Sequence, residues 1–203
     1  MTSLRHKTDE PSPRDGYLDA ARECILDVGW RRTTLTEVAR RAGVSRMTMY
    51  RAWSDMPQLL GDLMTREWGG VVAAAVEEAD ARVGAEAPGA DRLVAEMVAT
   101  VAALRENELF LRIVELDPEL LLPYLLARRG RSQDAILTLT KGRIRAGQAD
   151  GSIRAGDAAA MARACLLACH GFVLSGHTMV DDAVDQAALD DELTALLDGA
   201  VRA

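Results

Sequence analysis

The stretch 34–53 constrains the fold most, because it contains two short helix signals separated by a glycine. Thr34 and Glu37 have the spacing of a capping box, in which the Thr hydroxyl accepts from the Glu37 N–H and the carboxylate returns to the cap. Gly43 ends this first helix, and Ser45 caps the next. The inward-facing residues of the first helix are Leu35, Val38, Ala39 and Ala42. Two short helices joined by a turn that contains Gly predict a helix-turn-helix.

The remaining sequence is also predicted to be helical. A helix with Ser12 as its cap ends at Gly29, and apolar residues at a 3.6-residue period continue after position 55. The expected helices cover 13–28, 35–42, 46–52, 55–83, 91–106, 107–116, 117–129, 131–149, 157–179 and 185–201. We therefore predict an all-α fold, in which a three-helix helix-turn-helix head is joined by a long helix to a helical dimerisation and ligand-binding domain. The predicted division is 1–55, which includes a loose arm 1–11, and 56–203.

The charge is distributed unevenly along the chain. The formal net charge is −7, yet residues 1–53 hold ten Lys and Arg against seven Asp and Glu. The head therefore has a net charge of +3, and the remaining residues have −10. Only the part that touches phosphate has to be basic, so an acidic chain is compatible with nucleic-acid binding by its head.

The compartment is predicted from the cysteines and from one apolar segment. Three cysteines, an odd number, and a polar start without a secretory signal indicate a reducing, cytoplasmic compartment. The segment 158–180 is the most membrane-like, but Arg163, His170 and His177 interrupt it. We expect a buried helix there and no membrane association.

The run TLTEVARRAGVSRMTMYRAWSDMPQLL, residues 34–60, resembles the DNA-binding head of the TetR family of transcriptional regulators. The resemblance covers about residues 14–62 and includes the capped helix, the Ala-Gly-Val-Ser turn, the tyrosine and the next capped helix. It implies a homodimer that binds a near-palindromic double-stranded operator. The chain departs from the family at Met56, where Lys is usual, and at Trp53, where Phe is common.

The resemblance also implies which residues contact DNA. Arg46, Met47 and Thr48 start the recognition helix, and residues there reach base edges in the major groove. Thr34, Ser45 and Tyr50 suit phosphate contacts, which position the protein without reading sequence. Arg51 is expected to replace the cation missing at position 56. Met49 and Trp53 are assigned to packing. The plainer alternative is that 34–53 is only part of a helical core.

Dimerisation is expected through the last two helices, as in the TetR family. The apolar stripe of the last helix comprises Leu189, Leu193, Leu196, Leu197, Ala200 and Val201. A monomer is expected to leave this stripe exposed, and large exposed apolar patches usually mark interfaces. The alternative is that the helix folds back within one subunit.

A small-molecule effector pocket is expected between the helices of the second domain. The candidate lining residues are Met64, Trp68, Met97, Val101, Phe110, Tyr124, Leu125, Ile136, Arg163, His170 and Phe172. Arg163, His170 and His177 are seven residues apart and so share a helix face. An anionic ligand is one possible partner; solvent, acidic neighbours or the other subunit are the alternatives. Most apolar residues at such spacing are simple core.

Metal, cofactor and enzyme functions find little support in the sequence. Cys165 and Cys169 share one helix face, and His170 and His177 point away from it. This face therefore offers two thiol ligands, whereas zinc requires about four. Buried cysteines more often act as small hydrophobes, although a thiol or metal sensor stays an alternative. No phosphate loop or catalytic triad signature is present, so we expect no cofactor, no metal and no enzyme. The prediction is an effector-modulated repressor, with a constitutive DNA-binding regulator that only dimerises as the alternative.

Overall fold

The computed structural model describes residues 12–84 and 86–202. Its elements are α1 (Pro13–Val28), η1 (Trp30–Arg32), α2 (Leu35–Arg41), α3 (Arg46–Ala52), α4 (Met56–Val83), α5 (Gly89–Glu106), α6 (Glu108–Leu116), η2 (Pro118–Leu120), α7 (Leu122–Leu126), α8 (Arg131–Asp150), α9 (Ala158–Ser175), η3 (Gly176–Thr178) and α10 (Gln186–Val201). No β-strand occurs among the described residues, and Ile153 and Arg202 form an isolated bridge. The all-α prediction is confirmed.

The caps explain where the first helices begin. Ser12 and Asp15 form a reciprocal capping box, with the Asp15 N–H 3.3 Å from the Ser12 Oγ. Thr34 accepts from the Glu37 N–H at 3.2 Å. The carboxylate of Glu37 does not return to the cap, because it binds Arg40 at 2.6 Å, so only half of the predicted box forms. Gly43 turns the chain with a φ of 67°, a conformation that favours glycine.

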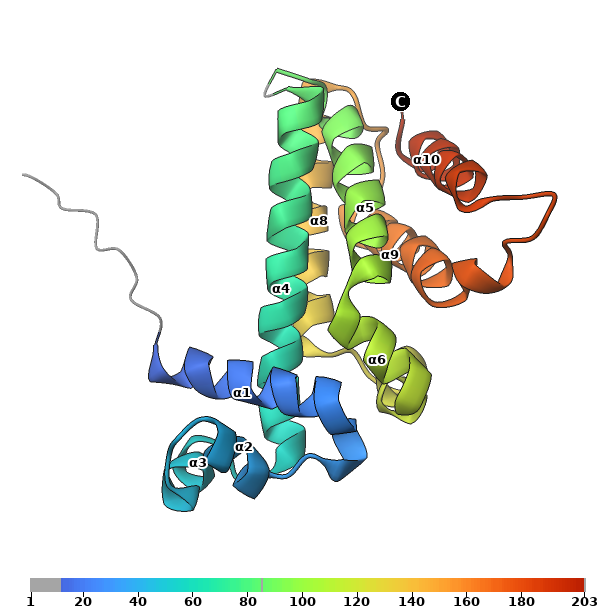
Figure 1. The fold of residues 1–203 in the computed structure, drawn as a ribbon. Coiled ribbons are helices and arrows are strands. Elements are labelled where there is room, and N and C mark those ends of the chain that lie inside the picture. The colour runs from blue at the N-terminus through green and yellow to red at the C-terminus, as the bar shows by residue number, and fades with distance from the viewer. Residues whose placement is uncertain (1–11, 85, 203) are drawn as a thin grey trace, which may run out of the picture.

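The head and the body are stacked along α4. Figure 1 shows α1 crossing the base of α4, with α2 and α3 below it and α5 and α8 alongside its upper part. One apolar core joins α1, α2 and α3 to the start of α4 and to α6. Met49 and Trp53 lie in this core and are 0% and 1% exposed, as their assignment to packing required. A second core joins α5, α8, α9 and α10. The first core crosses position 55, so α4 and the head share one packed unit.

Several predicted helix ends differ from the structure. The expected helix 117–129 is instead the 3-10 turn η2, Pro118–Leu120, followed by the short helix α7, Leu122–Leu126. α5 begins at Gly89, two residues before the expected start. α9 ends at Ser175, because the chain tightens into a 3-10 turn over Gly176–Thr178, so His177 lies outside the helix.

The apolar stripe of α10 also differs from the expectation. Leu193 and Leu197 are 0% and 1% exposed in a single chain, because they pack in the second core. Leu196 is 50% exposed, Ala200 is exposed and Leu189 is half-buried. The expectation that a monomer leaves the whole stripe exposed is therefore wrong. Only the face with Leu196 and Ala200 is open.

The segment Ala158–Thr178 is long and apolar enough to cross a membrane, with a mean hydropathy of 1.5. α9 packs against α5, α8 and α10, yet only 28% of this segment is buried within the chain. The expected buried helix is therefore only partly covered within a single chain, where Leu167 is 70% exposed.

Candidate DNA-binding surface and ligand cavity

The recognition helix α3 presents a polar outer face. Met49 points into the core, whereas Met47 and Tyr50 are 63% and 52% exposed. Arg46 and Arg51 are also exposed. The structure therefore places four of the predicted DNA-contacting side chains on one accessible helix at the end of the molecule (Figure 1).

Of the other three predicted DNA contacts, Thr34 and Ser45 act as helix caps, and Thr48 lies in the first turn of α3. Ser45 accepts from the Thr48 N–H at 3.1 Å, and the two hydroxyl oxygens lie 2.9 Å apart. Thr34 caps α2. Thr34 and Ser45 remain exposed, whereas Thr48 is half-buried and shares its hydroxyl with Ser45. A hydroxyl that accepts a capping hydrogen bond can still donate its own proton to a phosphate oxygen.

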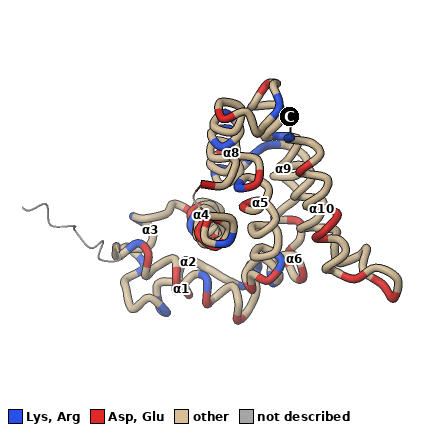
Figure 2. The backbone as a smooth tube through the Cα atoms, turned by 90° about the horizontal axis from the view of Figure 1, so that it is seen from above, with Lys and Arg blue, Asp and Glu red and all other residues tan. Residues whose placement is uncertain are grey.

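Basic and acidic residues lie close together along α1, α2 and α3 (Figure 2). The ion pairs separate the basic ones into paired and unpaired groups. Arg40 binds Glu37, and Arg41 binds Asp27 at 2.5 Å. Arg46 and Arg51 have no ion-pair partner within residues 12–84 and 86–202. Unpaired guanidinium groups on an exposed helix can meet phosphates or base edges without first breaking an ion pair. Met56 packs against the core of the head.

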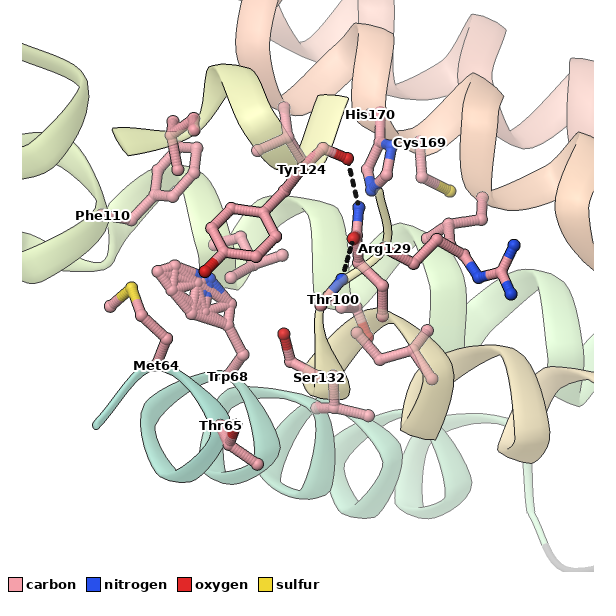
Figure 3. Close-up of a pocket in the computed structure, with 18 of the residues that line it drawn as sticks. Met64, Thr65, Trp68, Thr100, Phe110, Tyr124, Arg129, Ser132, Cys169 and His170 are labelled. Carbon is pink, nitrogen blue, oxygen red and sulfur yellow. Dashed lines mark hydrogen bonds between the residues drawn. The ribbon is translucent and has the colours of Figure 1, made fainter. Parts of the chain in front are cut away.

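A cavity of about 320 Å³ lies in the body between α4, α5, α8 and α9, with α6 and α7 at one end. Figure 3 shows Met64, Trp68, Phe110, Tyr124 and His170 around it. The rings of Trp68 and Phe110 meet edge to face with centroids 6.0 Å apart. Of the predicted pocket residues, those that line the cavity are Met64, Trp68, Met97, Val101, Phe110, Tyr124, Leu125, Ile136 and His170. This volume is typical of a small-molecule site.

Arg163 and Phe172 do not line the cavity. Arg163 is exposed and donates to the carbonyl of Ala159 at 3.2 Å, while Phe172 packs against the second core. His177 is exposed in η3. The expected stripe of Arg163, His170 and His177 therefore does not face one ligand, because α9 ends before His177 and only His170 reaches the cavity.

The sequence interpretation missed most polar groups of the cavity. Arg128 and Arg129 come from the segment between α7 and α8, Arg131 comes from the start of α8, and Glu96 comes from α5. Further polar lining residues are Thr65, Thr100, Ser132, Gln133 and Thr140. The cluster of arginines was visible in the sequence, but nothing local indicated that this segment returns to α4.

Burial controls the ionisation of the cavity groups. It lowers the pKa of His170, so the imidazole is neutral at pH 7. It raises the pKa of Glu96, opposed by the nearby Arg143. Arg143 donates from Nε to Glu96 Oε2 at 3.1 Å, and its Nη2 lies 2.8 Å from Oε1 as an ion pair without hydrogen-bond geometry. Burial also raises the pKa of the Cys169 thiol to about 12.

Asp62 on α4 links the head to the cavity. Its carboxylate accepts a hydrogen bond of 2.8 Å from the indole of Trp53, directly after α3, and also binds Arg14 of α1 and Arg131 of α8. Arg14 additionally lies over the Trp53 ring, 4.6 Å from its centroid. Burial raises the pKa of Asp62, but the three donors outweigh it and hold the pKa at about 2. The group is an anion at any physiological pH.

Comparisons with known proteins settle the family. A model described as bacterial regulatory proteins, tetR family, matches residues 18–63. An uncharacterised HTH-type transcriptional regulator of Mycobacterium tuberculosis is 35% identical over 196 residues, which cover 97% of this chain and 98% of the relative. The chain belongs to the TetR family. It is a DNA-binding transcriptional regulator whose α2 and α3 form the helix-turn-helix.

Two solved structures share the TetR fold with this chain. The transcriptional repressor QsdR of Rhodococcus erythropolis superimposes with a TM-score of 0.65 at 17% identity, covering 95% of this chain and 98% of QsdR. The regulator FadR of Bacillus subtilis, in complex with stearoyl-CoA, gives a TM-score of 0.63 at 18% identity, covering 92% of this chain and 98% of FadR.

Proposed function

We propose that this TetR-family regulator is a homodimeric repressor whose affinity for a near-palindromic operator is lowered when a small molecule occupies the cavity. The observation that carries the proposal is the combination of two features in one chain. The exposed helix α3 carries arginines without ion-pair partners among the described residues, and a mainly apolar cavity lies along α4 in the body. In this proposal Arg46, Met47 and Thr48 read bases, Thr34, Ser45 and Tyr50 bind phosphates, and Arg51 adds a phosphate contact.

The dimer is proposed to form through α9 and α10. Leu167 of α9 and Leu196 of α10 are 70% and 50% exposed. On α10, Ala200 is exposed and Leu189 is half-buried. Apolar side chains that a single chain leaves open on adjacent helices are best covered by the same surface of a second copy. Leu193 and Leu197 support this surface from beneath rather than forming it.

The effector is proposed to occupy the cavity around Trp68, Phe110 and Tyr124. Mainly apolar cavities with a few polar groups are the usual form of a ligand site. The FadR of Bacillus subtilis, which shares this fold, was crystallised with stearoyl-CoA. We also propose a cytoplasmic, non-enzymatic protein, with DNA binding in 1–55 and dimerisation and effector binding in 56–203.

The competing candidate is a constitutive regulator whose body only dimerises. A thiol sensor is disfavoured by burial, since Cys24, Cys165 and Cys169 are 1%, 3% and 7% exposed. The test is to select a duplex from a random library with the full-length protein and then to measure its dissociation constant against a small-molecule panel. Weakened DNA binding by a compound that also protects Trp68 from quenching supports the proposal. A panel in which cavity-bound compounds leave the DNA affinity unchanged favours the constitutive regulator.

A further inference from the structure

The cavity is long and narrow. Its wall includes residues of α4 from Leu60 to Val76, which are sixteen positions apart. At 1.5 Å per residue this stretch extends over about 24 Å. A volume of about 320 Å³ drawn out over such a length suits an extended chain better than a compact ring system.

The charged groups of the wall lie at opposite ends of the cavity. Arg131 contacts Asp62 near the start of α4. Arg143, which pairs with Glu96, lies 3.8 Å from Asp80 near the end of α4. Glu96 is 5% exposed and already paired with Arg143, so its charge is compensated. The first end carries Arg128, Arg129 and Arg131. The available charge in the wall is therefore positive and confined to one end.

Arg131 has a special position among these cations. It lines the cavity, is 64% exposed and binds Asp62, which is only 16% exposed. A Cβ added at Gly61 would lie 3.3 Å from its Nη2, so the guanidinium crosses α4 closely over this glycine. Arg129 instead binds Asp134 at 2.8 Å, and Arg128 lies over the Tyr124 ring. Arg131 alone of the three is tied to the head, through Asp62 and Trp53.

We propose that the effector is an amphipathic acid, with an apolar chain in the cavity and an anionic head that competes with Asp62 for Arg131. This inference rests on the proposed function and names its ligand class. When the acid takes Arg131, Asp62 keeps Trp53 and Arg14 but loses its link to α8. The head then loses this one link to α8, while its apolar core with α4 and α6 remains, and its orientation relative to the body shifts. A neutral molecule with the same chain fills the cavity without breaking the link.

The test uses two probes with the same chain, decanoate and decan-1-ol, on the full-length protein. Calorimetry gives the dissociation constants, and fluorescence anisotropy on the selected duplex gives the effect on DNA binding. The variant is Arg131→Gln, and the matched control is Arg145→Gln, which removes an exposed cation of α8 outside the cavity lining. We expect decanoate to bind wild type and control at least tenfold more tightly than decan-1-ol, and Arg131→Gln to reduce this ratio to near one.

A second variant gives a readout with the opposite sign. Asp62→Asn removes the charge that competes for Arg131, so decanoate is expected to bind several-fold more tightly while decan-1-ol binding is unchanged. A purely structural role for the ion pair would weaken or spare both probes alike. The expected effect on DNA is a several-fold rise in dissociation constant with decanoate for wild type and none for Arg131→Gln.

The outcomes separate this inference from the proposed function. If decan-1-ol binds as tightly as decanoate and also releases DNA, effector control stands and the acid head is wrong. If neither probe binds, the amphipathic acid is wrong, and the panel experiment judges effector control independently. Equal responses of wild type and Arg131→Gln to decanoate would also overturn the inference.

Discussion

The indole N–H of Trp53 donates to the carboxylate of Asp62 at 2.8 Å, and this bond ties the end of the recognition helix to α4. The ring of Trp53 is 1% exposed and meets Tyr17 edge to face, with centroids 6.3 Å apart. Because α1 and α8 also reach the same carboxylate through Arg14 and Arg131, Asp62 joins three elements of the head and body at one point.

Asp62→Asn is expected to lower the free energy of unfolding by about 1–2 kcal/mol at pH 7. This range is small because water reaches Arg14 and Arg131 and screens their charges. The folded pKa of Asp62, about 2, lies below the ordinary value of 3.8. The stabilisation is therefore fully present above pH 3.8 and is lost as the pH falls toward 2. Urea unfolding of wild type and variant from pH 7 to pH 2.5 should show the two curves converge at the acid end. A difference that is constant over this range would contradict the assignment.

Gly147→Ala is expected to destabilise the body by about 1–3 kcal/mol through overpacking. A Cβ at Gly147 would lie 2.5 Å from Cδ1 of Ile153, which packs back against α8 from the segment that follows it. Gly142→Ala on the same helix is the control, because nothing lies within 4 Å of its added Cβ. The control should be neutral or more stable by up to about 1 kcal/mol. Equal unfolding midpoints for the two variants would mean that the close contact does not form.

Leu167→Glu combined with Leu196→Glu is expected to yield monomers, because each charge would be buried without a partner in the proposed dimer interface. The same change at Leu193 should instead unfold the body, since Leu193 is 0% exposed in a single chain. Light scattering and circular dichroism distinguish dissociation from unfolding. A folded double variant that remains dimeric would place the interface on other helices.

The cysteines are expected to react slowly with Ellman's reagent at pH 8. Burial raises the pKa of Cys24, Cys165 and Cys169, and the thiolate is the reactive form. All three thiols should titrate in 6 M guanidinium chloride, which provides the control. Fast reaction of Cys165 or Cys169 in the folded protein, with a change in DNA affinity, would support the thiol sensor instead.

The sequence predicts those features of the fold that depend on local signals. Ser12, Thr34 and Ser45 cap helices as expected, since a cap and its partner N–H lie within three residues of each other. The predicted return of the Glu37 carboxylate to the cap was wrong, because Arg40 on the same helix surface binds that carboxylate.

Long-range placement was harder to predict from the same residues. An amphipathic helix specifies an apolar face but not what covers it, so Leu193 and Leu197 were assigned to an interface although they fill the core of their own chain. Arg163 and His170 have the spacing of one helix face. The point at which α9 ends, and which side chains reach the cavity, depend on packing against other helices. The role of Arg131 depends on a contact across 69 residues, for which no local pattern exists.

The most direct test of the account is the affinity of the full-length protein for its selected duplex, measured by fluorescence anisotropy against a scrambled duplex. Arg46→Ala should weaken binding to the selected duplex by about 1–3 kcal/mol and reduce its preference over the scrambled one. Tyr50→Phe should weaken both by a similar factor, because a phosphate contact carries no sequence information. Arg145→Ala, on the body, should match wild type. If Arg46→Ala and Tyr50→Phe both bind the selected duplex as tightly as wild type, DNA recognition by α3 is contradicted.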